Sequence, residues 1–384
     1  MNALPSLAEI EAITGFIDSV VPPTPQISWP LLNARAGTEL WVKHENHTPI
    51  GSFKVRGALQ YLARLAARDP AVRRVIAATR GNHGQAVAFA AQRHGLTATI
   101  VVPHGNSVEK NAAMLGLGAE LIEHGDDFQA ALEFAQRIAG ERRLHFVPSY
   151  HRDLAWGNAV STLQFLKNCP PLDRVYVPIG LGSGICGMIA ARDALGLPTR
   201  IIGVATELTR GIALSFAVKR VVASPATTRI ADGMACSTPN PEALAHILGG
   251  VERIAMVTDD QVESAMRSYF TDTHNVAEGA AGAGLAAVLN ERAQNSGRRV
   301  GVCSPAATWT APYSPGCSQP PRNSLAPAPP GLSRVGWIYP FSPAHRKPGC
   351  AASAKSSAIR SASAARARRP RSTRSSTGSL PPAS

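Results

Sequence analysis

The sequence predicts an α/β protein with two three-layer domains, each a mainly parallel sheet covered by helices on both faces. From residue 72 onward, short runs rich in β-branched residues alternate with longer amphipathic stretches, in two successive series. The 384 residues suffice for about two or three domains of roughly 150 residues each. Because parallel strands need a crossover connection, this strict alternation favours parallel pairing.

The first series predicts a small α/β domain over residues 72–148. The runs rich in β-branched residues predict strands at 72–78, 97–102, 120–123 and near His145. The amphipathic stretches between them predict helices at 83–94, 108–117 and 126–139.

The second series predicts a larger domain, which we expect to comprise residues 1–71 and 149–302. Its N-terminal part begins with a polar, capped helix at Ser6. The predicted strands are 174–178, 200–204, 253–257 and 299–303. The predicted helices are 157–166, 183–195, 259–272 and 277–295.

The composition excludes several classes of protein. A hydrophobic fraction of 45% with 17% charged residues excludes disorder throughout the chain, and no apolar run reaches the roughly 18 residues of a membrane span. The polar N-terminal helix does not resemble a secretory signal, so we expect a cytoplasmic protein with no membrane partner. The six cysteines form no Cys-x-x-Cys pair and no His cluster has metal-ligand spacing, which predicts reduced thiols and no metal site.

The formal net charge of +13 is concentrated at one end of the chain. Residues 303–384 hold 11 Lys and Arg, no acidic residue and 14 of the 30 prolines, whereas residues 1–302 hold 28 basic and 26 acidic residues. Such a composition cannot build a core, so we predict a low-complexity, disordered basic tail. A nucleic-acid-binding arm is the alternative interpretation, but the nearly neutral body favours no nucleic-acid partner.

Lys54 is the first candidate functional residue. It lies in the segment Ser52-Phe53-Lys54-Val55-Arg56-Gly57, at the start of a predicted helix that runs to Leu65. A lysine at such a position is usually solvated. In an apolar pocket, however, a lysine can lose its proton and form an imine with an aldehyde.

A second candidate is the turn from Thr79 to Gln85, between a predicted strand and the following helix. Free backbone N–H groups and the positive end of the helix dipole suit a carboxylate there, and Asn82 can donate a hydrogen bond to a phenolate-like oxygen. The alternative is an ordinary glycine-rich turn in which Asn82 caps the helix.

The third candidate is the glycine loop, residues 180–184 between a predicted strand and helix. Alternate glycines let the backbone present its amides to a phosphate without a Cβ in the way. A dinucleotide site is the alternative, but no acidic residue is suitably placed after the next strand, which reads Gly203-Val204-Ala205-Thr206. The loop therefore predicts a phosphate site rather than a dinucleotide site.

The three motifs together resemble the fold-type II pyridoxal 5'-phosphate (PLP) enzymes, specifically the threonine/serine dehydratase group. Asn82 follows Lys54 by 28 residues and Gly180 follows Asn82 by 98, in the family's order. Residues 230–233 and 276–280 resemble two further blocks, so the resemblance covers roughly residues 6–302. It implies the tryptophan synthase β-like architecture, PLP as cofactor and a homodimer.

The resemblance also implies a role for each motif residue. Lys54 would hold PLP as a Schiff base and then remove the substrate Cα proton. The cofactor would be bound by Phe53, Lys54, Asn82, Gly180, Leu181, Gly182, Ser183, Gly184 and Glu278. The substrate would be bound by Thr79, Arg80, Gly81, Asn82 and His83. The implied reaction is β-elimination of a hydroxy amino acid such as threonine or serine, which yields a 2-oxo acid and ammonia.

Arg80 departs from the family pattern, because the racemase branch has a serine there that acts as an acid/base. A guanidinium is a poor proton shuttle but a good carboxylate ligand, so racemisation is disfavoured. We hypothesise that Arg80 adapts the site to an unusual or more anionic hydroxy amino acid. The wording around Arg80 and the glycine loop also resembles the hydroxyectoine-utilisation dehydratase branch, which we keep as an alternative.

The largest departure follows Val302, where the family continues into Ser-Gly-Gly-Asn with a serine hydroxyl at the pyridine nitrogen. Here the chain reads Cys303-Ser304-Pro305-Ala306-Ala307-Thr308. With permitted codons read one base earlier, the same segment can spell Ser-Gly-Gly-Asn. We therefore hypothesise that residues 303–384 are an out-of-frame translation, and an inactive remnant of such an enzyme is a further alternative.

Overall fold

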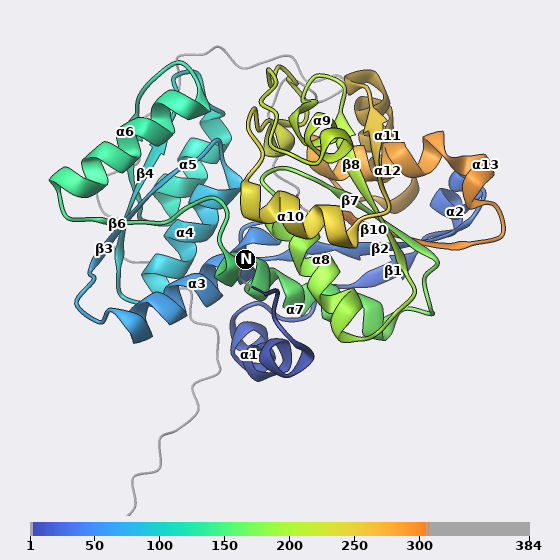
Figure 1. Ribbon diagram of the computed structural model, residues 1–384, viewed down its shortest axis with the longest axis horizontal. Coiled ribbons are helices and arrows are strands. Elements are labelled where there is room, and N and C mark those ends of the chain that lie inside the picture. Colours follow the sequence, from blue (N-terminus) through green and yellow to red (C-terminus); the bar gives the residue numbers. More distant parts are fainter. Residues whose placement is uncertain (1–2, 305, 307–384) are drawn as a thin grey trace, which may run out of the picture. The chain divides into compact units, whose positions relative to one another are not determined.

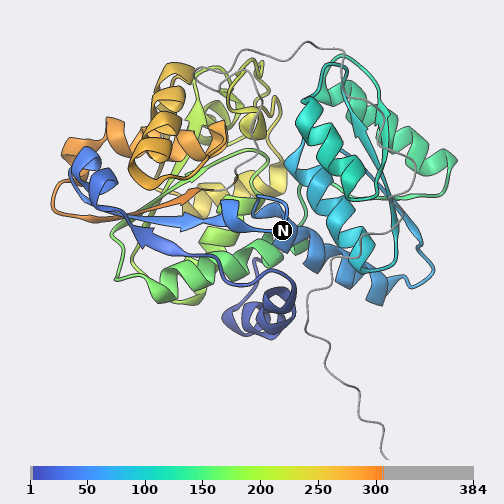
Figure 2. The ribbon, with the colours of Figure 1, turned by 180° about the vertical axis from the view of Figure 1, so that it is seen from behind.

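The computed structural model describes residues 3–304 and 306, which lie in one compact unit. Their strands form two sheets (Figures 1 and 2). The six-stranded sheet has the order β1 (Gln26–Ser28), β2 (Glu39–His44), β10 (Arg299–Ser304), β7 (Arg174–Pro178), β8 (Arg200–Thr206), β9 (Arg253–Val257). The four-stranded sheet has the order β5 (Glu120–Glu123), β4 (Thr97–Val102), β3 (Arg74–Ala78), β6 (His145–Phe146).

All neighbouring strands pair in parallel except β1 and β2. The predicted α/β class with mainly parallel sheets is therefore confirmed. Most parallel strands are joined through helices, as a crossover requires. The helices are α1 (Leu7–Val20), α2 (Pro30–Ala36), α3 (Lys54–Arg68), α4 (Asn82–Arg93), α5 (Val108–Gly116), α6 (Phe128–Glu141), α7 (Arg152–Asn168), α8 (Ser183–Ala194), α9 (Gly211–Val218), α10 (Pro241–Gly250), α11 (Asp259–Thr273), α12 (Gly279–Asn290) and α13 (Arg292–Asn295).

Both faces of the four-stranded sheet are buried, which explains why its strands are apolar throughout. On β3, Ile76 and Ala78 pack in the same apolar cluster as buried residues of α6. Val75 and Ala77, which point the other way, belong to the main core together with α4. Successive side chains of a strand point to opposite faces, so helices cover this sheet on both sides.

The central position of β10 builds the larger sheet around a strand from late in the sequence. A Cβ at Gly301 would lie 3.0 Å from the Phe165 ring of α7, on one face of the sheet. Val302 packs in the apolar cluster of α12, on the other face. These contacts make the six-stranded sheet the middle of three layers.

The predicted start of the tail at residue 303 is wrong. Cys303 and Ser304 continue β10, where they pair in register with Lys43 and His44 of β2. Ala306 forms a β-bridge with Ser52, and its carbonyl accepts a hydrogen bond from the Glu278 N–H at 3.0 Å. Pairing with β2 and burial hold this segment in the fold. The disorder predicted for the remainder of the tail, and the altered reading frame, lie outside the described residues.

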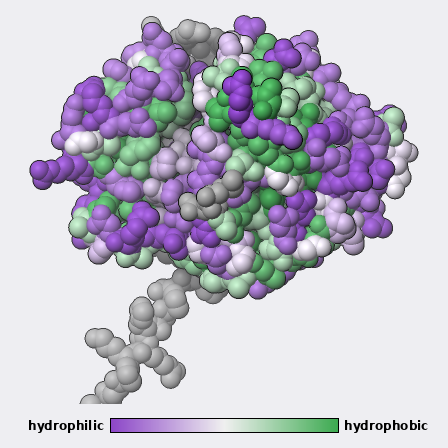
Figure 3. Space-filling view, viewed as in Figure 1, coloured by the Kyte–Doolittle hydropathy of each residue, from purple (hydrophilic) through white to green (hydrophobic). Residues whose placement is uncertain are grey.

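Within residues 3–304 and 306, no helix is both long and apolar enough to cross a membrane. Polar side chains cover much of the face seen in Figure 3, while apolar ones gather around α9. Leu214 and Val218 of α9, together with nearby Leu208, are exposed large apolar side chains.

Candidate active site

Lys54 is the first residue of α3 and lines a pocket with its ammonium group 5.6 Å from the centre of the Phe53 ring. The helix axis is fixed by packing against α7, where Asn158 accepts a hydrogen bond from the Gly57 N–H at 3.1 Å. Desolvation lowers the pKa of Lys54 below its usual value, against smaller opposing effects of Cys236 and Glu278. The site thus favours the uncharged amine, which is the nucleophilic and basic form.

The glycine loop connects β7 to the N-terminus of α8, beside the Phe53 ring. Gly182 has a φ of +107°, a conformation that L side chains rarely adopt, and a Cβ there would lie 2.6 Å from the Ala243 Cβ. The first N–H groups of α8 have no partner within the helix. The loop therefore presents backbone donors at the positive end of a helix dipole, which suits a phosphate.

Substituting Gly182 tests this loop. We expect Gly182→Ala to weaken PLP binding about tenfold and to lower the free energy of unfolding by about 1–3 kcal/mol, because the new Cβ strains the backbone and displaces the loop. Absorbance titration with PLP and urea denaturation measure the two effects. Gly196→Ala is the matched control, since Gly196 also has a positive φ but no atom lies within 4 Å of its added Cβ. Equal PLP affinities of the two variants would contradict the expectation.

The turn after β3 is fixed by the Thr79 hydroxyl, which accepts hydrogen bonds from the N–H groups of Gly81 at 2.9 Å and Gly84 at 3.3 Å. Asn82 begins α4, and its side-chain amide donates to the two carboxylate oxygens of Glu278 at 2.9 and 3.0 Å. Glu278 immediately precedes α12, so this contact joins the two halves of the site.

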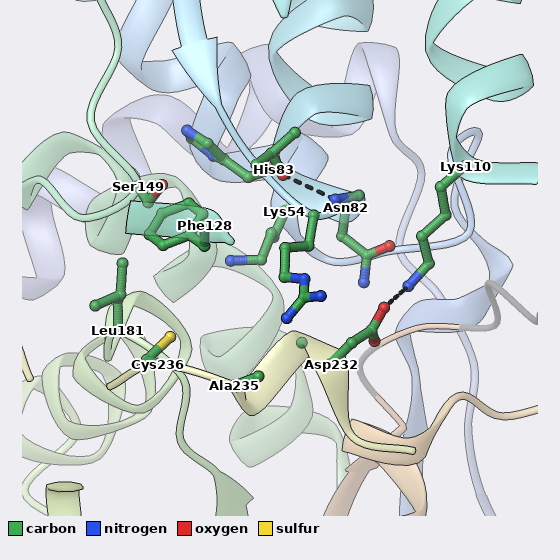
Figure 4. A pocket seen from close by; sticks show the side chains of 14 residues that line it. Lys54, Asn82, His83, Lys110, Phe128, Ser149, Leu181, Asp232, Ala235 and Cys236 are labelled. Atoms are coloured by element: carbon green, nitrogen blue, oxygen red, sulfur yellow. Dashed lines mark hydrogen bonds and ion pairs between the residues drawn. The ribbon is translucent and has the colours of Figure 1, made fainter. Parts of the chain in front are cut away.

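Two adjoining pockets contain all the residues predicted for the site. Lys54, Asn82 and Leu181 line both. The cofactor-side pocket also includes Phe53, Gly180, Gly182, Ser183, Gly184 and Glu278. The substrate-side pocket also includes Thr79, Arg80, Gly81 and His83 (Figure 4). The loops that follow β3 and β7 meet here, at the carboxyl ends of two parallel sheets, where ligands bind in such folds.

The sequence did not indicate Lys110, a buried residue of α5 in the substrate-side pocket. Its ammonium lies 2.6 Å from the Asp232 carboxylate and 3.9 Å from that of Glu278 (Figure 4). Burial opposes the charge of Lys110, but Glu278 and Asp232 together raise its pKa above the usual value. Asp232 lies in the block 230–233 that sequence reasoning had noted, whereas Lys110 lies in a helix with an ordinary amphipathic pattern.

His83 is only 6% exposed, and its Nε2 has no hydrogen-bond partner in the described part of the chain. Desolvation, and to a smaller extent the charge of Lys54, lower the pKa of His83 to about 3. His83 is therefore neutral in the pocket at any physiological pH.

Stability at acid pH should report this buried imidazole. Between pH 6.5 and about 3 the unfolded chain binds a proton at His83 that the folded chain does not, so the free energy of unfolding falls as the pH drops through this range. We expect His83→Gln to flatten the acid side of the stability curve, measured by urea denaturation at several pH values. His44, whose pKa is lowered to about 4, keeps part of the slope. The exposed His124→Gln is the control, and an unchanged slope in His83→Gln would contradict the assignment.

Among the described residues, no group of three or more His, Cys, Asp and Glu side chains could hold a metal ion.

A family model described as "Pyridoxal-phosphate dependent enzyme" matches residues 17–305. The chain belongs to this family. Its cofactor is accordingly pyridoxal phosphate, and the chain has the family's enzyme fold.

The chain is 32% identical to the L-threonine ammonia-lyase of Thermotoga maritima over 287 residues, which cover 74% of this chain and 71% of the relative. It is 29% identical to the L-threo-3-hydroxyaspartate ammonia-lyase of Saccharomyces cerevisiae over 300 residues, which cover 78% and 92%. Among solved structures it is similar to a pyridoxal 5'-phosphate-dependent aspartate racemase, with a TM-score of 0.76, 26% identity and coverage of 80% and 98%. It is also similar to a bacterial threonine deaminase, with a TM-score of 0.73, 27% identity and coverage of 79% and 99%.

The residues in the two pockets fit pyridoxal phosphate. Lys54 supplies an amine for the aldehyde, and the Asn82 amide lies beside it in the same pocket. The glycine loop leaves the wall of this pocket free of bulky side chains, and a Cβ at Gly184 would already lie 3.2 Å from the Phe53 ring. The donor set therefore matches the aldehyde, the phenolic oxygen and the phosphate of the cofactor.

Proposed function

We propose that this chain catalyses the dehydration and deamination of a hydroxy amino acid to a 2-oxo acid and ammonia. The observation that carries the proposal is the position of Lys54, whose amine lies where the cofactor-side and substrate-side pockets meet. The names of the relatives support it, since several are threonine ammonia-lyases or dehydratases.

In this proposal the residues divide the work by position. The glycine loop, Phe53, Asn82 and Glu278 hold the cofactor, which when bound supplies an electron sink for the pair released at Cα. The turn from Thr79 to His83 orients the substrate carboxylate at the N-terminus of α4. Lys54, in its uncharged form, accepts the Cα proton, after which the β-hydroxyl leaves.

Elimination is favoured over racemisation because of Arg80. Racemisation needs a second acid/base on the opposite face of Cα, and a guanidinium keeps its proton throughout the physiological range. Arg80 lines the substrate-side pocket, so it binds anions there rather than exchanging protons.

The test is turnover by the purified 384-residue protein with added PLP, using threonine, serine and 3-hydroxyaspartate. We expect a visible absorbance band from lysine-bound PLP and formation of the matching 2-oxo acid. A band without product would favour an inactive remnant that retains the cofactor site. Absence of both would contradict the proposal and support the interpretation in which the altered sequence after Val302 has removed the function.

The remaining expectations belong to the same proposal. We propose a division into a large domain, residues 1–71 and 149–302, and a small domain, residues 72–148, with a cytoplasmic homodimer as the functional form. The exposed apolar side chains around α9 support the dimer, since a second copy would cover them. Light scattering of the purified protein decides between monomer and dimer.

A further inference from the structure

Arg80 is a partly buried cation in the wall of the substrate-side pocket. Across residues 3–304 and 306 its guanidinium makes no hydrogen bond and no ion pair. A guanidinium carries five N–H donors in a planar fork and stays charged at every accessible pH. The pocket therefore contains a positive group whose donors are all available to a ligand.

The acidic residues nearby do not neutralise Arg80. Asp232 is held by Lys110 at 2.6 Å, and Glu278 contacts Asn82 and lies 3.9 Å from Lys110. Arg80 also disfavours the charge of Lys110, so the two cations are close enough to interact. Their proximity follows from packing, because the aliphatic part of Lys110 crosses Gly81, where a Cβ would lie 2.3 Å from the Lys110 Cδ.

The α-carboxylate of an amino acid has a separate place in the turn. The backbone N–H groups at the start of α4 have no acceptor within the helix, apart from those bound by the Thr79 hydroxyl. These amides suffice for one carboxylate at the helix N-terminus. Arg80 is thus an additional anion ligand, beyond what a substrate with a single carboxylate needs.

We propose that Arg80 makes the site selective for hydroxy amino acids that carry a second carboxylate, as in 3-hydroxyaspartate. The guanidinium fork binds this carboxylate through two parallel hydrogen bonds, while the turn binds the α-carboxylate. The inference rests on the proposed function, because it names the substrate class of the same pocket. Threonine fills the same position with a methyl group, which leaves the guanidinium unpaired.

The first experiment measures binding without turnover. L-malate and 3-hydroxybutyrate are the des-amino counterparts of 3-hydroxyaspartate and threonine, and neither has an amine that can react with PLP. Calorimetry on the PLP-loaded protein gives the ratio of the two affinities for the wild type, Arg80→Gln and Arg80→Lys. We expect the wild type to prefer malate, and Arg80→Gln to reduce the preference by about 10- to 100-fold, as expected for a charge-assisted bidentate contact. Arg80→Lys, which keeps the charge but loses the fork, should give an intermediate ratio.

Arg93→Gln is the matched control, because Arg93 is an exposed arginine at the other end of the same helix. It should leave the malate preference at the wild-type value. The ratio of kcat/KM for 3-hydroxyaspartate to that for threonine should fall in Arg80→Gln by a similar factor.

A wild type with no malate preference, or an Arg80→Gln variant with an unchanged ratio, would overturn the inference, since Arg80 would then bind the common carboxylate or none. Failure of the proposed function is distinguishable: it would appear as no turnover of any hydroxy amino acid, while the calorimetric ratio still decides the role of Arg80.

Discussion

Replacement of Lys54 by alanine should abolish the visible absorbance band of bound PLP and lower kcat by at least about 10²-fold. The physical reason is that one amine serves two needs. Lys54 is the nucleophile that fixes the cofactor in the pocket, and its lowered pKa makes it the base for the Cα proton. Absorbance spectroscopy and a 2-oxo acid assay with saturating PLP measure the two effects.

Lys167→Ala is the control for this experiment, because Lys167 is an exposed lysine paired with Glu11 far from the pockets. It should retain both the band and the turnover. If Lys54→Ala kept wild-type turnover, the assignment of the catalytic amine would be wrong. If it lost the band but not the turnover, another group would have to act as the base.

The second large effect concerns stability. Arg56→Met should lower the free energy of unfolding by about 3–5 kcal/mol, because it leaves the buried Glu45 carboxylate without its main partner. The Arg56 side chain is fully buried, donates to Glu45 at 2.8 Å and also donates to the backbone carbonyl of Val21 at 3.0 Å. Although burial opposes the charge of Glu45, Arg56 holds its pKa below the usual value. Urea denaturation near pH 7 measures the change.

Arg137→Met provides the contrast. Arg137 and Glu141 form an exposed pair on α6, with 57% and 52% of their side chains accessible, so we expect a change of about 0–1 kcal/mol. Arg56 lies two residues after Lys54 on α3, so its loss should also disturb the pocket. Equal destabilisation by the two variants would show that the Arg56 pair contributes little.

Much of the fold could be predicted because its strands are short apolar runs with clear limits. The observed bounds of β4, β5, β7 and β9 are the predicted ones, since β-branched residues fill each run and polar residues flank it. β2 could not be predicted, because Lys43 is fully buried within it. The Lys43 ammonium donates to the Thr24 carbonyl at 2.8 Å, a tertiary contact that no local pattern reveals.

The predicted helix 277–295 illustrates a different limit. Its small residues favour one long helix, but α12 begins only after Glu278, and α13 follows as a separate short helix. Glu278 has an extended backbone and contacts Asn82 instead. A contact across the site therefore overrides the local helix propensity.

The candidate site was predictable in its motifs and not in its surroundings. Motifs far apart in the sequence all line the two pockets, because each follows a parallel strand or opens a helix at the same end of the fold. Lys110 was missed since nothing in its helix distinguishes it from a solvated lysine. Only the folded structure reveals that it is buried beside Asp232.

The position of β10 between β2 and β7 also determines the order in which the chain can fold during synthesis. Until residue 304 has left the ribosome, β2 and β7 each present an unpaired edge, and no earlier strand of this sheet fills the gap. Such edges bind other extended chains readily. The larger sheet must therefore close late, through contacts between residues more than 250 positions apart, which predicts slow folding and a need for protection of the nascent chain.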